Sequence, residues 1–238
     1  MPPAERRLLQ VDRREAVGQY VLLVLRNDGG DVGLPGQFFM LQAEPEPAGA
    51  YLPRALSAAW ADEREIAFLI EPGGAGTRAL VTASEISVLG PLGRGFELRP
   101  GPAILVGGGI GAAILPWLVR RLEGPVTTVL GFRSEWHAVC APLIDPAATV
   151  VLEPTFVTEP VARLLPSPDA SVYACGPDPM LNAVAALCAE HDTPCQLAME
   201  AAMACGFGAC YGCAVRIDGG WKRLCVEGPV VERDRVLA

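Results

Sequence analysis

Clusters of basic residues are absent from this sequence, and histidines are scarce. The 238 residues carry 19 Lys and Arg against 27 Asp and Glu, a formal net charge of −8, and the basic residues are scattered. Because a nucleic-acid site needs a concentrated basic surface, we do not expect nucleic acid as a partner. No Ser-His-Asp set or paired-carboxylate site stands out. We therefore assign no catalytic role to either histidine, His137 or His191.

Uninterrupted apolar runs are also missing. The N-terminal segment MPPAERRLLQVDRREAV lacks the apolar core of a signal peptide, so export is not indicated. Residues 101–119 carry no charge, but five glycines and two prolines interrupt them, which favours a buried strand, turn and helix over a membrane span. With 51% hydrophobic residues, the chain can bury real cores. We expect a soluble, cytoplasmic protein without membrane contact.

Eight cysteines are present, and four of them form the pattern C-x4-C-x2-C-x11-C near the C-terminus: Cys205, Cys210, Cys213 and Cys225. This spacing is typical of a 2Fe-2S cluster, and the glycines between the ligands let backbone amides approach the sulfides. A structural zinc site is the alternative, although zinc ribbons usually contain C-x2-C twice. The other four are expected to be buried small hydrophobes: Cys140, Cys175, Cys188 and Cys195.

Three regions differ in their pattern. Residues 1–100 contain short apolar runs separated by Gly and Pro, which predicts an antiparallel barrel with strands near 20–25, 37–42, 55–60, 65–70 and 85–89. Residues 101–197 alternate strands and helices, which predicts a doubly wound parallel sheet with helices near 112–122 and 177–191. Residues 198–238 contain the cysteines and a predicted hairpin of 214–217 and 221–225, turning at Asp218-Gly219-Gly220. This last segment is too small to fold unaided.

Two turns of the predicted parallel sheet suit a phosphate. In ILVGGGIGAAI, residues 104–114, a buried strand meets a helix at Gly107, Gly109 and Gly111. A second turn, Cys175-Gly176-Pro177, ends another strand and opens a helix. Tight strand-helix packing is the alternative for the first of these turns. Two such turns at one carboxyl edge nevertheless favour a dinucleotide site.

The barrel contains two candidate anion sites, Arg54-Ala55-Leu56-Ser57 and the loop Gly73–Thr77. A solvated arginine and an ordinary turn are the alternatives. A nicotinamide exchanges electrons in pairs, whereas a 2Fe-2S cluster takes one at a time. A chain with both sites needs a flavin between them, and the barrel is the region left for it.

The strings PGQF, GPLGRGF, LVGGGIGAA, GFRS, CGPDPM, MEAAMACGFGACYGC and LCVEGPVV resemble the electron transfer subunits of dihydroorotate dehydrogenase B, in the ferredoxin reductase superfamily. The resemblance spans nearly the whole chain. It implies FAD in the barrel, with Arg54 toward the pyrophosphate and Ser57 toward the flavin ring. It further implies FAD contacts at Leu69, Ile70, Glu71, Gly76 and Thr77, cluster ligation by the four C-terminal cysteines, and a matching NAD framework of Gly107, Gly109, Gly111, Cys175, Gly176, Pro177 and Met180.

Three departures from the family pattern bear on the cofactors. Glu71 stands where an arginine is common, and Leu56 where many superfamily members have an aromatic residue. After Leu152, Glu153-Pro154-Thr155 runs directly into Phe156, where the family often has a longer loop beside the nicotinamide. The choice between NADH and NADPH is therefore left open by the sequence.

The resemblance implies a route from dihydroorotate through FMN on a separate catalytic subunit, then the 2Fe-2S cluster and FAD of this chain, to NAD+ in pyrimidine biosynthesis. Two copies of each chain are expected in the complex. Phe207 and Tyr211 are candidates for the contact with that partner or for packing over the cluster. Two other functions stay open: a subunit of a ferredoxin-NADP reductase or sulfide dehydrogenase type complex, and a zinc-stabilised, non-enzymatic binding module.

Overall fold

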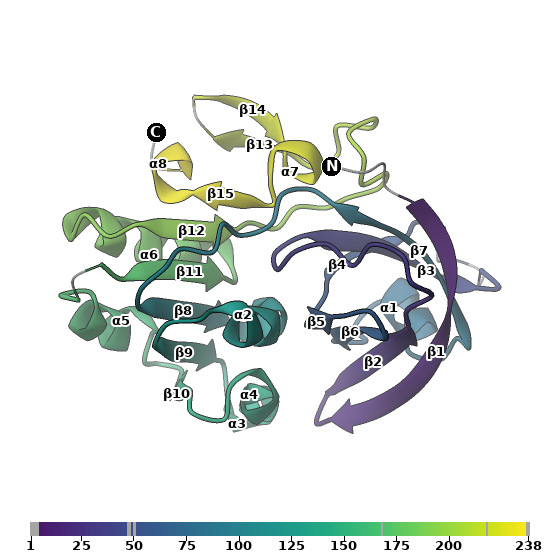
Figure 1. The fold of residues 1–238 in the computed structure, drawn as a ribbon, viewed down its shortest axis with the longest axis horizontal. Helices are drawn as coiled ribbons and strands as arrows, with labels where there is room; N and C mark the ends of the chain where they lie inside the picture. The colour runs from purple at the N-terminus through teal and green to yellow at the C-terminus, as the bar shows by residue number, and fades with distance from the viewer. Residues whose placement is uncertain (1–4, 47–48, 50, 168, 218, 237–238) are drawn as a thin grey trace.

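The computed structural model describes residues 5–46, 49, 51–167, 169–217 and 219–236. Figure 1 shows an antiparallel sheet and a parallel sheet side by side, with the C-terminal hairpin above them. The expected order of barrel, parallel sheet and C-terminal cysteine segment is therefore observed.

The N-terminal sheet is an antiparallel half barrel with the strand order β4-β3-β7-β1-β2-β6-β5. Its elements are β1 (Glu5–Val17), β2 (Tyr20–Arg26), β3 (Phe38–Glu44), β4 (Arg54–Ser57), β5 (Trp60–Ala61), β6 (Glu65–Ile70), α1 (Ala75–Leu80) and β7 (Glu85–Leu92). The single strand expected near 55–60 is two strands, since β4 pairs with β3 while β5 pairs with β6.

Strand β1 was not predicted, because its many charged residues hide the alternation typical of a strand. Arg7 and Leu9 point inward, whereas Leu8 between them is 55% exposed. The buried guanidinium of Arg7 donates hydrogen bonds to Asn27 Oδ1 at 2.8 Å and to Asp28 Oδ1 at 2.8 Å. These partners satisfy its donors and allow a charged side chain inside the half barrel. Strand β1 pairs with β2 and β7 and so joins the two halves of the sheet.

The second sheet has the strand order β10-β9-β8-β11-β12-β15. Its strands are β8 (Ala103–Gly108), β9 (Val126–Phe132), β10 (Thr149–Leu152), β11 (Ser171–Cys175), β12 (Cys195–Ala198) and β15 (Val230–Glu232); all neighbours are parallel except β12 and β15. Its helices are η1 (Gly109–Ile114), α2 (Leu115–Arg121), α3 (Glu135–Ala138), α4 (Ala141–Ile144), α5 (Thr158–Leu164), α6 (Asp178–Glu190) and α8 (Arg233–Val236).

The uncharged run 101–119 forms β8, η1 and the start of α2, as predicted, although the helix expected from 112 starts with a 3-10 turn. Cys140, Cys175, Cys188 and Cys195 are all buried and unpaired by disulfides, as expected. Among the described residues, no helix is both long enough and apolar enough to cross a bilayer.

The C-terminal segment comprises β13 (Ala214–Ile217), β14 (Gly220–Arg223) and α7 (Leu224–Glu227). The predicted second strand of the hairpin, 221–225, was too long: it ends at Arg223, and Cys225 lies in a helical turn. The Glu227 carboxylate accepts a hydrogen bond from the Arg223 backbone N–H at 2.8 Å, which stabilises this turn. Asp218 of the predicted hairpin turn lies outside the described residues. Strand β15 then joins the parallel sheet, which anchors the segment.

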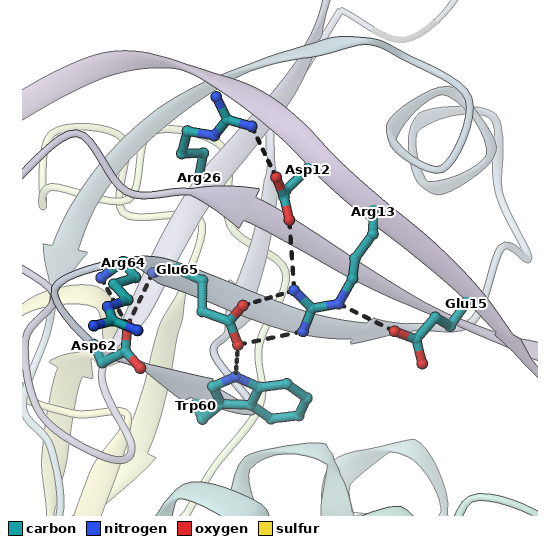
Figure 2. A network of polar contacts seen from close by, with 8 residues as sticks. All are labelled: Asp12, Arg13, Glu15, Arg26, Trp60, Asp62, Arg64 and Glu65. Carbon is teal, nitrogen blue, oxygen red and sulfur yellow. Dashed lines mark hydrogen bonds and ion pairs between the residues drawn. The ribbon is translucent and has the colours of Figure 1, made fainter.

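Trp60 connects the two large sheets. Its indole N–H donates to Glu65 Oε1 at 2.7 Å, and Glu65 Oε2 pairs with Arg13 Nη1 at 2.7 Å (Figure 2). From the parallel-sheet side, the guanidinium of Arg120 lies 4.2 Å from the centroid of the Trp60 ring. A cation over an indole is attracted by the ring quadrupole. The network therefore reaches from β1 through β6 and β5 to α2.

We predict that Glu65→Gln destabilises the protein by about 1 kcal/mol at neutral pH. The hydrogen bond from Arg13 lowers the pKa of Glu65 below its ordinary value of 4.5. Its stabilisation is therefore present above that value and is lost as pH falls through the folded-state pKa. Chemical denaturation at about pH 7 and about pH 3 should show the difference between wild type and variant shrinking in acid. Exposed Glu63→Gln is the control, and an equal loss at both pH values would contradict the assignment.

Candidate cofactor sites

The four C-terminal cysteines lie in two pairs. The Sγ atoms of Cys213 and Cys225 are 3.1 Å apart and buried, and the side chain of Cys210 is near enough to that of Cys205 to help lower the pKa of its thiol. Among the described residues, no three His, Cys, Asp or Glu side chains are arranged to hold one metal ion. A 2Fe-2S cluster takes two protein ligands on each of its two irons, whereas structural zinc takes four on one ion. The two pairs fit the cluster better.

Backbone amides surround the first pair. Burial opposes ionisation of Cys205, but the N–H groups of Cys210, Phe207 and Ala209 outweigh it and lower the pKa of this thiol to about 6. Burial and the neighbouring Cys213 thiol raise the pKa of Cys225 to about 12. Iron would displace the proton from such a thiol, because a coordinating thiolate is stabilised directly by the metal charge. Amides directed at sulfur are the environment that a cluster needs.

The cysteine segment packs on the half barrel. Its buried members Cys213, Leu224 and Cys225 share one core with residues of β3 and β7, namely Phe38, Met40 and Leu92. Gly206 has φ +80, and a Cβ there would lie 2.4 Å from Met40 Cγ. Only glycine permits both this conformation and this close approach.

Strand β4 places the barrel candidates next to the cysteine segment. Ala55 packs against the core that contains Cys213 and Cys225, here called the cysteine core. Leu56 packs against the main core, which contains residues of both large sheets, because successive residues of a strand point to opposite faces. All four candidates of β4 are half-buried: Arg54, Ala55, Leu56 and Ser57. One strand thus separates the cysteine core from the main core.

Arg54 and the start of α1 come together as the predicted anion site requires. A Cβ on Gly76 would lie 2.1 Å from Arg54 Nε, so the guanidinium stem passes directly over this glycine. With the other described residues, the Arg54 side chain makes no hydrogen bond or ion pair. Thr77 Oγ1 instead donates to the Gly74 carbonyl at 3.1 Å and accepts from the Gly74 N–H, closing the first turn. A guanidinium that lies beside a glycine and pairs with none of the described residues suits a diphosphate.

A cavity of about 620 Å³ opens at the carboxyl edge of the parallel sheet and extends to the half barrel. Gly109, Pro177 and Met180 line it from the sheet, and Tyr20 and Glu71 from the barrel. Leu69 and Ile70 are the last two residues of β6, directly before Glu71. Both are buried, so their side chains belong to the core. The position of the cavity matches the rule that ligands bind where strand carboxyl ends meet helix starts.

The predicted glycines divide into two roles. A Cβ on Gly111 would lie 2.7 Å from Gly176 Cα, and one on Gly107 would lie 2.6 Å from Ala112 Cβ. These three glycines therefore let the two turns pack tightly, which was the alternative interpretation. Gly109, with φ +54, has open space where its Cβ would be and lines the cavity. Cys175 lies behind it, where burial raises the pKa of its thiol.

Several cavity residues were missed by sequence reasoning, among them Tyr20, Arg133, His137 and Thr158. His137 Nδ1 lies 2.8 Å from Ser134 Oγ, and Tyr20 donates to the His137 carbonyl at 3.2 Å. Arg133 follows β9 directly, so the rule for strand ends could have identified it. Tyr20 comes from the other sheet, where no sequence signal pointed to the cavity. The segment 153–158, expected to be shortened, supplies Glu153, Thr155, Phe156, Val157 and Thr158 to its wall.

Solved structures share this architecture. The NADH-dependent reduced ferredoxin-NADP oxidoreductase superposes with a TM-score of 0.83 at 22% identity, covering 97% of this chain and 90% of the other. A ferredoxin reductase of carbazole 1,9a-dioxygenase has a TM-score of 0.65 at 25% identity, covering 80% and 67%. The chain therefore has the ferredoxin reductase-like fold of flavin and iron-sulfur oxidoreductases.

Sequence comparison narrows this class. Residues 200–237 match the family model described as the iron-sulfur cluster binding domain of dihydroorotate dehydrogenase B. The "Dihydroorotate dehydrogenase B (NAD(+)), electron transfer subunit" of Caldanaerobacter subterraneus subsp. tengcongensis is 35% identical over 85% of this chain and 87% of that protein. Its counterpart in Clostridium acetobutylicum is 34% identical over 82% and 83%. The chain belongs to the family of dihydroorotate dehydrogenase B electron transfer subunits, as the resemblance indicated.

Gly206→Ala should remove most of the iron and acid-labile sulfide while FAD stays bound. The added methyl group would overlap Met40 in a backbone conformation that L side chains rarely adopt, at a cost of about 2 kcal/mol or more. Gly219→Ala is the matched control, because Gly219 also has positive φ (+66) but has nothing within 4 Å of its Cβ position. Iron, sulfide and flavin per chain would be measured. Full cluster content in the Gly206 variant would contradict the packing argument.

Arg54→Gln should weaken FAD binding by about 10- to 100-fold, because the lost charge-assisted contacts to a diphosphate amount to about 1.5 to 3 kcal/mol. The measurement is flavin fluorescence during dilution or titration of the apoprotein. Arg163→Gln, on the exposed face of α5, removes the same charge far from the barrel and should leave affinity unchanged. Equal FAD affinity in the two variants would argue against the assigned role of Arg54.

Proposed function

We propose that this chain carries electrons from the FMN of a dihydroorotate-oxidising partner to NAD+ through its own 2Fe-2S cluster and FAD. The observation that carries this proposal is the core that the cysteine segment shares with strands β3, β4 and β7. It puts Cys213 and Cys225 in one core with Ala55, on the strand that also carries Arg54 and Ser57. When bound, FAD exchanges electrons singly with a cluster and as a hydride with a nicotinamide.

The residues of the chain would hold and separate the cofactors. Arg54, Gly76 and Thr77 would receive the FAD diphosphate, while Ser57 and the backbone of 69–71 would contact the flavin. Gly109, Pro177 and Met180 would position NAD in the 620 Å³ cavity, and Gly107, Gly111, Cys175 and Gly176 would hold the turns behind it. Under this proposal residues 1–100 bind FAD, 101–197 bind NAD and 198–238 bind the cluster.

The surface of the cysteine segment supports a partner contact. Phe207 is 60% exposed, Tyr211 64% and Trp221 74%, so these side chains are accessible to a partner. Packing of Phe207 and Tyr211 over the cluster stays a prediction. Exposed aromatic residues are enriched at protein interfaces. We propose that this surface meets the catalytic subunit, with two copies of each chain in a cytoplasmic complex. A short distance between the cluster and the partner's FMN would follow from this contact.

The comparisons bear on each of the two alternative functions, the other oxidoreductase complex and the zinc-stabilised binding module. A subunit of a ferredoxin-NADP reductase type complex would share the same fold, so architecture alone does not separate it from our proposal. The 35% identity to dihydroorotate dehydrogenase B subunits over 85% of the chain favours our choice. A zinc-stabilised binding module is disfavoured by the iron-sulfur family match over 200–237 and by the paired cysteines.

Cys210→Ser tests the electron route. The variant should lose the cluster absorption and at least about 90% of the dihydroorotate-dependent NAD+ reduction, while NADH oxidation with an artificial acceptor stays near wild type. The reason is that only the first reaction needs one-electron transfer from the partner. Anaerobic stopped-flow spectroscopy with the catalytic subunit would follow both reactions. Cys188→Ser is the control, because Cys188 is a buried residue of α6 and is not one of the four proposed cluster ligands.

Unchanged coupled activity in the Cys210 variant would overturn the route. Wild-type protein that contains zinc without acid-labile sulfide would overturn the cluster assignment itself. Co-purification with a partner other than a dihydroorotate-oxidising subunit would favour the rival oxidoreductase complex.

A further inference from the structure

One arginine connects the two halves of the cysteine segment. Arg223 ends β14 and directly precedes α7, the helical turn that carries Cys225. Its Nη1 donates a hydrogen bond to the carbonyl oxygen of Gly208 at 2.9 Å. Gly208 lies in the loop between Cys205 and Cys210. A single side chain thus ties the loop of one cysteine pair to the helical turn of the other.

Arg223 is itself held in place from two sides. Its backbone N–H donates to Glu227 Oε2 at 2.8 Å, and its Nη2 pairs with Glu227 Oε1 at 3.4 Å. The guanidinium also lies 4.9 Å from the centroid of the Tyr211 ring. The arginine and glutamate side chains are only 28% and 27% exposed, so water screens them partially. A planar guanidinium with these contacts has a defined orientation, which a flexible ammonium would lack.

The carbonyl of Gly208 faces the arginine, and the loop around it packs on the helical turn of the second cysteine pair. This carbonyl accepts the hydrogen bond from Arg223 Nη1 at 2.9 Å. Gly208 has φ +89, and a Cβ there would lie 2.7 Å from Val226 Cγ2, so the loop packs directly on α7. The contact from Arg223 therefore helps to hold the loop between Cys205 and Cys210 against the helical turn that carries Cys225.

We propose that Arg223 is a positioning residue for the cluster: it holds the loop of the first cysteine pair against the helical turn that carries Cys225 and places a fixed positive charge beside the bound group, which raises the reduction potential. Reduction adds one negative charge to the cluster. A nearby cation and N–H donors to sulfur stabilise that charge, and such contacts are known determinants of cluster potentials. The inference rests on the proposed function, because it requires a 2Fe-2S cluster at these cysteines.

The test is a redox titration of the cluster, monitored by EPR, on the complete complex. Arg223→Gln should lower the midpoint potential enough to change the ratio of reduced to oxidised cluster about tenfold, which is about 59 mV for a one-electron couple. Arg223→Lys keeps the charge, so its potential should recover most of that shift. Both variants should lose the cluster faster than wild type after dilution into chelator. Arg216→Gln, on the exposed face of β13, removes the same charge from the hairpin and is the matched control.

A second variant covers the case in which Arg223→Gln fails to retain FAD and a normal fold. Glu227→Gln removes the negative partner while Arg223 stays, so the potential should shift upward, opposite to the arginine variant. An unchanged potential in both the Arg223→Gln and Glu227→Gln proteins, or an equal shift in Arg216→Gln, would overturn the role of Arg223. Wild-type protein without sulfide would instead overturn the proposed function, and this inference with it.

Discussion

The cysteine-bearing segment cannot bury its own apolar side chains, and its dependence on the half barrel organises the rest of the molecule. Cys213, Leu224 and Cys225 are buried in one core with Phe38, Met40 and Leu92 of β3 and β7. A segment of this size has too little core to be stable alone. The packing therefore couples the fold of the segment to the sheet that carries the flavin candidates.

Under the proposed assignment, this constraint puts the cluster next to the strand that carries the flavin candidates. Strand β4 is shared, with Ala55 on the cysteine side and Leu56 on the side of the main core. Barrel and parallel sheet are in turn joined through Trp60 and Arg120, and the cavity takes its walls from both sheets. The order of the proposed electron carriers follows this spatial order. Electron transfer is steeply dependent on distance, so the architecture itself serves the activity of the family.

Polar interactions fix the orientation of side chains and loops that hydrophobic packing has brought together. Arg7 enters the half barrel with its own hydrogen-bond partners, and Glu227 holds Arg223 against the cysteine loop. Both examples use arginine, whose planar fork can satisfy several acceptors at once. Such contacts contribute modestly to stability but fix orientation, which matters more near a cofactor than in a simple core.

The sequence by itself determined the ligand chemistry, the fold class and the family, because cysteine spacing, strand and helix periodicity and Gly-rich turns are local patterns. Only the tertiary structure decided which glycines pack and which faces the cavity: Gly111 meets Gly176, whereas Gly109 is open. It also decided that Tyr20 and Glu71 of the barrel reach the cavity, and that Arg54 crosses Gly76. These contacts join residues far apart in the chain. Their formation depends on how two sheets pack, which no local spacing encodes.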